Sequence, residues 1–174
     1  MKKIISLLLS LALFLSLVGC AGTYHGTDEL IEKAREEIPI SDAATTDIQF
    51  AGGHVQDKNA LFWFVSGDEH QAHYYLPMEV EIKHESQYKF VRTYEPLDGS
   101  PKDIAVLLWN NSYLFLINNP ACTAIRITDE NGTYEKTIEK DAYPYVFSCS
   151  SKSEFSPILT TEYVFLDADG NELR

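Results

Sequence analysis

The stretch IAVLLWNNSYLFLI, residues 104–117, decides the fold class, because it consists of two apolar arms around a short polar turn. Residues 104–109 and 113–117 have the length of strands, and Asn110 and Asn111 tolerate the positive φ that a tight hairpin turn requires. The stretch therefore predicts an antiparallel β-hairpin. Neither arm alternates apolar with polar residues, so we expect both faces of the hairpin to be covered by other parts of the protein.

Strand signals continue on both sides of this hairpin. Further strands are predicted at residues 60–65, 73–82, 88–94, 123–128, 134–138, 143–149 and 163–166. In residues 73–82 the apolar Val80 alternates with Glu79 and Glu81, which places the acidic side chains on the solvent face. Gly132 supplies the positive φ of the turn between residues 123–128 and 134–138. Short strands with turns about every ten residues predict a mainly β fold, an antiparallel sandwich or barrel-like domain.

One short N-terminal helix is predicted before the strands, at residues 28–38. Thr27 is the expected N-cap, and Glu29 is expected to pair with Lys33 one turn later. The apolar positions that fall on one face of this helix are Leu30, Ile31, Ala34 and Ile38. Pro39 ends the run. The helix is therefore amphipathic, and we expect it to pack on the sheet.

The first 20 residues have the pattern of a secretion signal. Lys2 and Lys3 precede an apolar run from residue 4 to residue 18, which is short for a membrane-spanning helix of about 20 residues. The run ends in Leu17-Val18-Gly19-Cys20, which resembles the lipobox of bacterial lipoproteins. The resemblance implies that the thiol of Cys20 receives a diacylglyceryl group, that cleavage makes Cys20 the new N-terminus, and that further acylation, such as by palmitate, follows. Two or more acyl chains anchor a protein stably.

The resemblance also implies a domain organisation and a location. Residues 1–19 are expected to be a cleaved signal peptide, residues 20–26 the lipidated cysteine with a short linker, and residues 27–174 a single β-rich domain. The mature protein is expected on the extracytoplasmic face of the bacterial cell membrane, held by lipid on Cys20. The outer membrane is the alternative location where the host has one. Beyond its leader, the chain resembles the small lipoproteins of bacterial envelopes.

The charge of the chain argues against one class of partner. The sequence has 14 basic and 26 acidic residues. Because Lys2 and Lys3 lie in the leader, the mature part keeps 12 basic and 26 acidic residues, a formal charge of −14. A surface of this charge repels nucleic acid and anionic head groups. We therefore expect no nucleic-acid partner and no membrane adhesion through a basic patch.

Two cysteines remain after Cys20, and they permit a disulfide. Cys122 and Cys149 lie in the same half of the chain, and an even number of thiols outside the cytoplasm is compatible with a bond between them. The alternative is two buried, apolar thiols. Neither belongs to a Cys-x-x-Cys motif, so thiol catalysis is not expected.

Other residue groups are better explained by structure than by chemistry. His70 and His73, beside Asp68 and Glu69, are spaced for opposite faces of a strand, so we expect loop histidines rather than a metal site. Residues 167–171, DADGN, resemble the start of a calcium loop but lack its further oxygen ligands, and a turn is expected there. The aromatic residues at 62–64, 74–75 and 109 are expected in the core rather than on a sugar-binding surface.

These observations predict a function class without a ligand. The sequence contains no Gly-x-Ser-x-Gly, Ser-x-x-Lys or His-Glu-x-x-His motif, so no catalytic residue, cofactor or metal is assigned. We expect a membrane-anchored extracytoplasmic lipoprotein that acts as a non-catalytic binding or interaction module for an unidentified envelope protein or polymer. The alternative is an envelope hydrolase with an unrecognised active site.

Overall fold

A computed structural model describes residues 22–42, 44–67, 73–139, 142–150 and 161–174. Strands and one helix follow each other in the order β1 (Thr23–His25), α2 (Gly26–Glu37), β2 (Ile48–Gln56), β3 (Asn59–Ser66), β4 (Tyr74–His84), β5 (Gln87–Thr93), β6 (Ile104–Trp109), β7 (Ser112–Ile117), β8 (Ala124–Asp129), β9 (Gly132–Thr137), β10 (Tyr145–Ser150) and β11 (Glu162–Leu166). The predicted mainly β fold with one short N-terminal helix is confirmed.

The strands form three antiparallel sheets. Sheet A has the order β1-β5-β4-β3-β2, sheet B the order β10-β7-β6, and sheet C the order β11-β8-β9. Within the described ranges each sheet stays open, so the fold is consistent with the predicted sandwich and contains no closed barrel. The segment between β5 and β6 leads from sheet A to sheet B. It is bonded to β6 through Leu97, whose N–H donates to the Val106 carbonyl at 2.7 Å.

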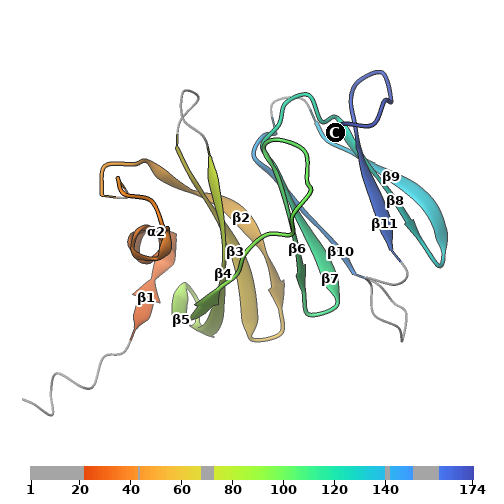
Figure 1. Ribbon diagram of the computed structural model, residues 1–174. Helices are drawn as coiled ribbons and strands as arrows, with labels where there is room; N and C mark the ends of the chain where they lie inside the picture. The colour runs from red at the N-terminus through yellow and green to blue at the C-terminus, as the bar shows by residue number, and fades with distance from the viewer. Residues whose placement is uncertain (1–21, 43, 68–72, 140–141, 151–160) are drawn as a thin grey trace, which may run out of the picture.

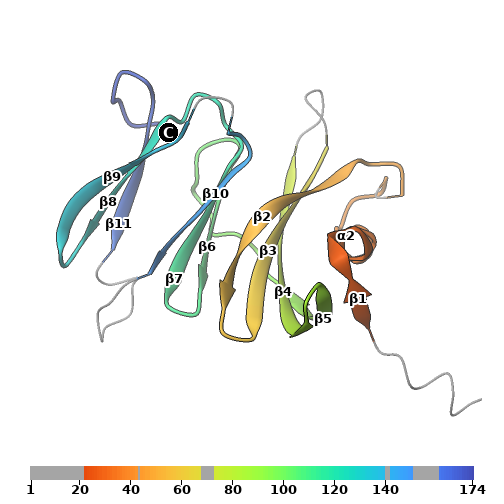
Figure 2. The same cartoon turned by 180° about the vertical axis from the view of Figure 1, so that it is seen from behind.

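The helix and the sheets lie in four layers, in the order α2, sheet A, sheet B and sheet C, in both Figure 1 and Figure 2. Side chains alternate along each strand, so each inner sheet contributes to two cores. The core between α2 and sheet A contains Leu30, Ala34, Phe62, Phe64 and Met78. The core between sheets A and B contains Leu61, Trp63, Val65, Leu107 and Leu114. The core between sheets B and C contains Val106, Phe115, Ile125, Ile127 and Phe165.

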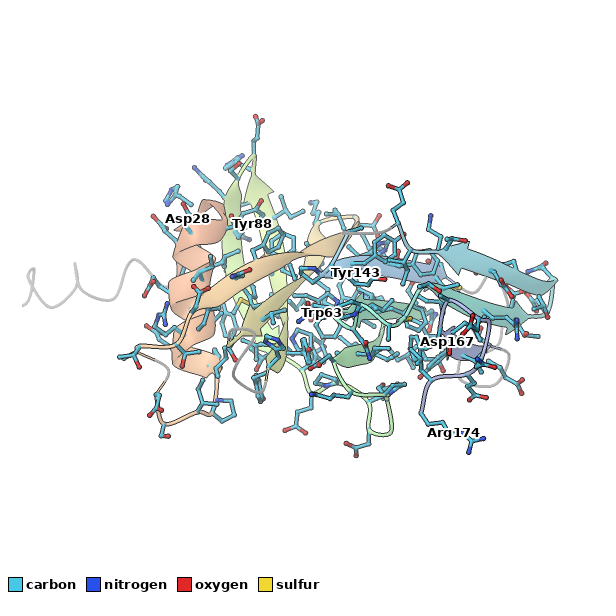
Figure 3. The ribbon with its side chains drawn as sticks, turned by 90° about the horizontal axis from the view of Figure 1, so that it is seen from above. Asp28, Trp63, Tyr88, Tyr143, Asp167 and Arg174 are labelled. Carbon is cyan, nitrogen blue, oxygen red and sulfur yellow. The ribbon has the colours of Figure 1, made fainter. Side chains whose placement is uncertain are left out.

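Sheet B is the middle of this stack, which confirms that both faces of the 104–117 hairpin are covered. Every residue of β7 is buried, and Leu108 is the one partly exposed residue of β6. The hairpin turn uses positive φ at Asn110 (46°) and Asn111 (60°). Figure 3 shows Trp63 in the interior, between Asp28 of the helix and Asp167 at the far end of the stack.

The helix differs from the prediction at its first turn. It begins at Gly26, so Thr27 lies inside it, and the N-cap residue His25 makes no side-chain capping bond. Instead, Glu29 Oε2 accepts the His25 backbone N–H at 2.7 Å from within the first turn. This bond turns Glu29 toward His25. The predicted Glu29–Lys33 pair is therefore wrong, and Lys33 Nζ pairs with Glu36 at 3.2 Å and Glu37 at 2.5 Å.

The predicted linker at residues 20–26 is shorter than expected. Residues 23–25 form β1, which pairs antiparallel with β5, with Tyr24 opposite Tyr88. The open edge of β5 supplies the partner, and a strand of three residues is too short to show a periodic pattern. The sheet therefore begins three residues after Cys20.

Glu79 also differs from the prediction, because its side chain is buried: it is 6% exposed and lies within a run of buried residues from Leu76 to Val80. Its side chain points toward the sheet-B side of β4, where Tyr94 O–H donates to Glu79 Oε2 at 2.5 Å and Arg92 Nε donates to the same oxygen at 3.2 Å. These two donors satisfy Oε2 of the buried carboxylate. A residue that follows strand β5, Tyr94, thus covers a position that alternation alone places in solvent.

Candidate functional site

The best candidate site is a pocket of about 450 Å³ at one end of the interface between sheets A and B, which we call the seam pocket. It lies where β3 ends, β4 begins and the β6–β7 hairpin is joined to the rest of the chain. The residues that line it are Gln49, Val65, Gly67, His73, Asp103, Asn118, Pro120 and Pro144. This volume is within the range of small-molecule sites, about 300–1,000 Å³.

Two lining residues, Asp103 and Asn118, flank the β6–β7 hairpin. Asp103 directly precedes β6 and Asn118 directly follows β7, so the pairing of the two strands brings them together. Asn118 N–H donates to the Asp103 carbonyl at 2.9 Å. Asp103 has a φ of 59°, which turns the chain into the hairpin. The rigid middle layer of the stack therefore holds this side of the pocket.

Tyr75 on β4 connects these two side chains. Its hydroxyl donates to Asp103 Oδ1 at 3.1 Å and also bonds to the Asn118 side chain. Burial, above all, raises the pKa of Tyr75 far above its usual value. The hydroxyl therefore stays protonated at neutral pH and donates a hydrogen bond to the Asp103 carboxylate.

His73 and Gln49 lie on the sheet-A side of the pocket. His73 Nδ1 is 3.1 Å from the Ser66 carbonyl oxygen. A carbonyl only accepts, so Nδ1 carries the hydrogen and Nε2 of the neutral ring is an acceptor. Gln49 Nε2 donates to Asp47 Oδ2 at 2.8 Å, which orients the amide and leaves its oxygen as the acceptor.

The arrangement is suited to binding a small molecule that offers hydrogen-bond donors. Val65, Pro120 and Pro144 supply apolar walls, and the peptide bond before Pro144 is cis. The described lining residues include no serine, threonine, cysteine or lysine, and Asp103 and His73 are the lining side chains that can act as a nucleophile or a base.

Sequence patterns predict only a minor part of this pocket. They place His73 in a loop and Tyr75 in the core, whereas Asp103, Asn118 and Gln49 were missed. A signal for Asp103 and Asn118 existed, because they are the polar residues that immediately bracket the two apolar arms. Their meeting follows from the predicted hairpin itself.

The cysteines do not form the disulfide that the sequence permitted. Cys122 and Cys149 are both buried, free thiols in the core between sheets B and C. Cys122 Sγ contacts the Ala124 carbonyl at 3.5 Å, and Cys149 Sγ lies 3.0 Å from the Tyr134 hydroxyl. Each sulfur thus has its own polar partner. Burial raises the pKa of the Cys122 thiol, which keeps it uncharged and unreactive.

The other predicted groups are placed as follows. His70, Asp68, Glu69 and Cys20 lie outside the described residues, and no group of three or more potential metal ligands occurs in the described part of the chain. Residues 167–171 form the predicted turn, in which Asp167 Oδ1 accepts the N–H of Asp169 and of Asn171 at 2.9 and 2.8 Å. These bonds lower the pKa of Asp167. The aromatic residues 62–64 and Trp109 are buried in the core, as predicted, whereas Tyr74 and Tyr75 are only partly buried.

Comparison with known proteins gives no relative: no family model, no curated protein and no solved structure matches the chain. In the described residues, no helix has the length and apolar character needed to cross a membrane.

Proposed function

We propose that the protein is a lipid-anchored lipoprotein of the bacterial cell envelope, and that its mature domain is a non-catalytic binding module on the extracytoplasmic face. The observation that carries this proposal is the leader ending in Leu17-Val18-Gly19-Cys20, followed within three residues by the first strand. A lipid on Cys20 would therefore be attached close to the folded domain, with almost no free linker.

The order of the layers supports this architecture. The first described elements, β1 and α2, belong to the end of the stack that lies opposite sheet C and the C-terminus (Figure 1). Packed sheets are about 10 Å apart, so sheet C lies about 20 Å beyond sheet A. An anchor on Cys20 holds the α2 end, and it leaves the seam pocket and sheet C in the space beyond.

The charge of the anchored end is consistent with attachment by acyl chains. Helix α2 carries five acidic and two basic residues, and it is the outermost layer at this end. Anionic head groups repel such a surface. Attachment then depends on the lipid of Cys20, because the helix contributes no attraction of its own.

The seam pocket supports the proposal of a binding module, because it offers polar side chains that are already held in place. Asp103 accepts the Tyr75 hydroxyl and His73 is oriented by the Ser66 carbonyl, so both groups are positioned by protein partners. An envelope hydrolase remains the alternative, because a histidine and a carboxylate share the pocket. It would have to activate water between them.

The anchor is tested by membrane fractionation of cells that express the full chain, with metabolic palmitate labelling. The wild type is expected in the membrane fraction with label, and Cys20→Ser is expected to lose both properties. Ser16→Ala is the matched control, because it changes the same leader and keeps the four lipobox residues. A Cys20→Ser protein that stays in the membrane fraction as completely as the wild type would disprove the anchor.

A further inference from the structure

The hydrogen-bonding groups of the seam pocket are dominated by acceptors. The Tyr75 hydroxyl donates a hydrogen bond to Asp103, and one of the two N–H groups of the Gln49 amide donates to Asp47. The acceptors that remain on the lining side chains are the second carboxylate oxygen of Asp103, the amide oxygens of Gln49 and Asn118, and His73 Nε2. They outnumber the remaining donors, which are one N–H on each of the two amides. A ligand that matches this set brings several donors of its own.

The charge of the pocket selects the sign of the ligand. Asp103 is the one carboxylate among the described lining residues, and neither lysine nor arginine lines the pocket. Lys102 Nζ lies 3.9 Å from Asp103 Oδ2, but its side chain is 90% exposed, so water weakens this attraction. Asp47, which holds Gln49, adds a second carboxylate nearby. These charges repel anions and attract cations.

The walls of the pocket define the rest of the ligand. Val65, Pro120 and Pro144 offer apolar surface on which an aliphatic chain can pack. A volume of about 450 Å³ accommodates a small molecule or a single long side chain. An aliphatic chain that ends in a charged donor group therefore satisfies the acceptors, the charge and the walls together.

We propose that the seam pocket binds the primary ammonium group of an aliphatic amine. Asp103 is its counter-ion, the Gln49 amide oxygen and His73 Nε2 accept its remaining hydrogens, and the alkyl chain lies along the two prolines. This inference rests on the proposed function as a binding module. The amine can be a free diamine or the side chain of a lysine in a peptide, because both present the same alkyl ammonium group.

The test is calorimetric titration of the detergent-extracted mature lipoprotein with three probes of equal chain length. Butylammonium is expected to bind, whereas butan-1-ol and butyrate are not. Titration with 1,4-diaminobutane and with Nα-acetyl-lysine amide then distinguishes the free diamine from the peptide side chain, and tighter binding of either supports the proposal. Equal binding of butylammonium and butan-1-ol, or no binding of any amine, overturns it.

A matched pair of variants locates the site. Asp103→Asn keeps an oxygen that can accept the Tyr75 hydroxyl and tolerates the φ of 59° at this position, so the fold is retained while the charge is removed. We expect amine binding at least about tenfold weaker. Asp98→Asn changes an exposed acid of the same connecting segment and is expected to leave binding unchanged. Undiminished binding by Asp103→Asn overturns the site. The fractionation of Cys20→Ser does not depend on the pocket, so the two proposals fail separately.

Discussion

Strands β7 and β9 have the same length and both belong to hairpins, yet their environments are opposite. All six residues of β7, SYLFLI, are buried, and all six residues of β9, GTYEKT, are exposed. β7 is the central strand of sheet B, the middle layer, whereas β9 is an edge strand of sheet C, an end layer. The composition of each strand thus matches its place in the stack, because a strand covered on two faces needs a continuous apolar run and an edge strand of an end layer does not.

The same difference in coverage separates the seam pocket from the surface of sheet C. Asp103 and Asn118, which hold one side of the seam pocket, are attached to the ends of the covered hairpin. β9 consists mostly of charged and polar residues, and Tyr134 is its one large aromatic side chain. We therefore expect a rigid, selective site at the seam and a polar, easily altered surface on sheet C.

The largest loss of stability is predicted for the truncation of a core side chain in β7. The Phe115 ring is fully buried and contacts the rings of Tyr113, Phe147, Tyr163 and Phe165. Phe115→Ala is expected to lower the free energy of unfolding by about 3–5 kcal/mol, through lost burial and a cavity. Thr137→Ala in β9 is the control, with an expected loss under about 1 kcal/mol. Urea unfolding measures both, and equal losses would remove the distinction between the layers.

A smaller effect is predicted for the buried acid at the interface of sheets A and B. Glu79→Gln keeps the shape of the side chain but weakens its bonds to Tyr94 and Arg92. The expected loss in the free energy of unfolding is about 1–2 kcal/mol. Glu81→Gln, whose more exposed side chain pairs with Lys83, is expected to lose less. Equal losses would show that the burial of Glu79 does not matter for stability.

The last prediction concerns the free energy of unfolding at alkaline pH. Burial raises the pKa of Tyr75 and of Tyr163 above the usual 10.0. Above this pH the unfolded chain loses tyrosine protons that the folded chain keeps, so stability is full below pH 10 and falls as the pH rises further. The free energy of unfolding, measured from about pH 8 to about pH 11, tests this, because the range includes the usual pKa of tyrosine. The free energy of unfolding of Tyr75→Phe should fall less steeply with rising pH than that of the wild type. A wild-type free energy of unfolding that does not change over this range would contradict tyrosine burial as the cause.

Sequence patterns predicted the fold where an apolar run was joined to a recognisable turn. Residues 104–117 showed both the hairpin and its double coverage, because an apolar run with an Asn-Asn turn has few other solutions. The strand β1 was missed, since three residues carry no period and depend on the open edge of β5. Glu79 was placed in solvent, because its cover, Tyr94, follows a different strand.

The site was less accessible to sequence analysis than the fold. Gln49 and His73 line the same pocket as Asp103 only because sheets A and B stack on each other. The order in which sheets stack has no local sequence pattern from which it could be predicted. Asp103 and Asn118 were within reach, as the residues that bracket the hairpin. The cysteines show the converse: their number permitted a bond, but each thiol has its own partner in the core.

The β6–β7 hairpin is a buried middle layer that holds one side of the seam pocket, and amide hydrogen exchange measures how well its strand β7 is covered. The amides of β7 are expected to exchange only through global unfolding, and the amides of β9 that face away from β8 are expected to exchange orders of magnitude faster through local opening. Phe115→Ala should accelerate exchange in β7. Similar protection of β7 and β9 in the wild type would contradict the layered arrangement.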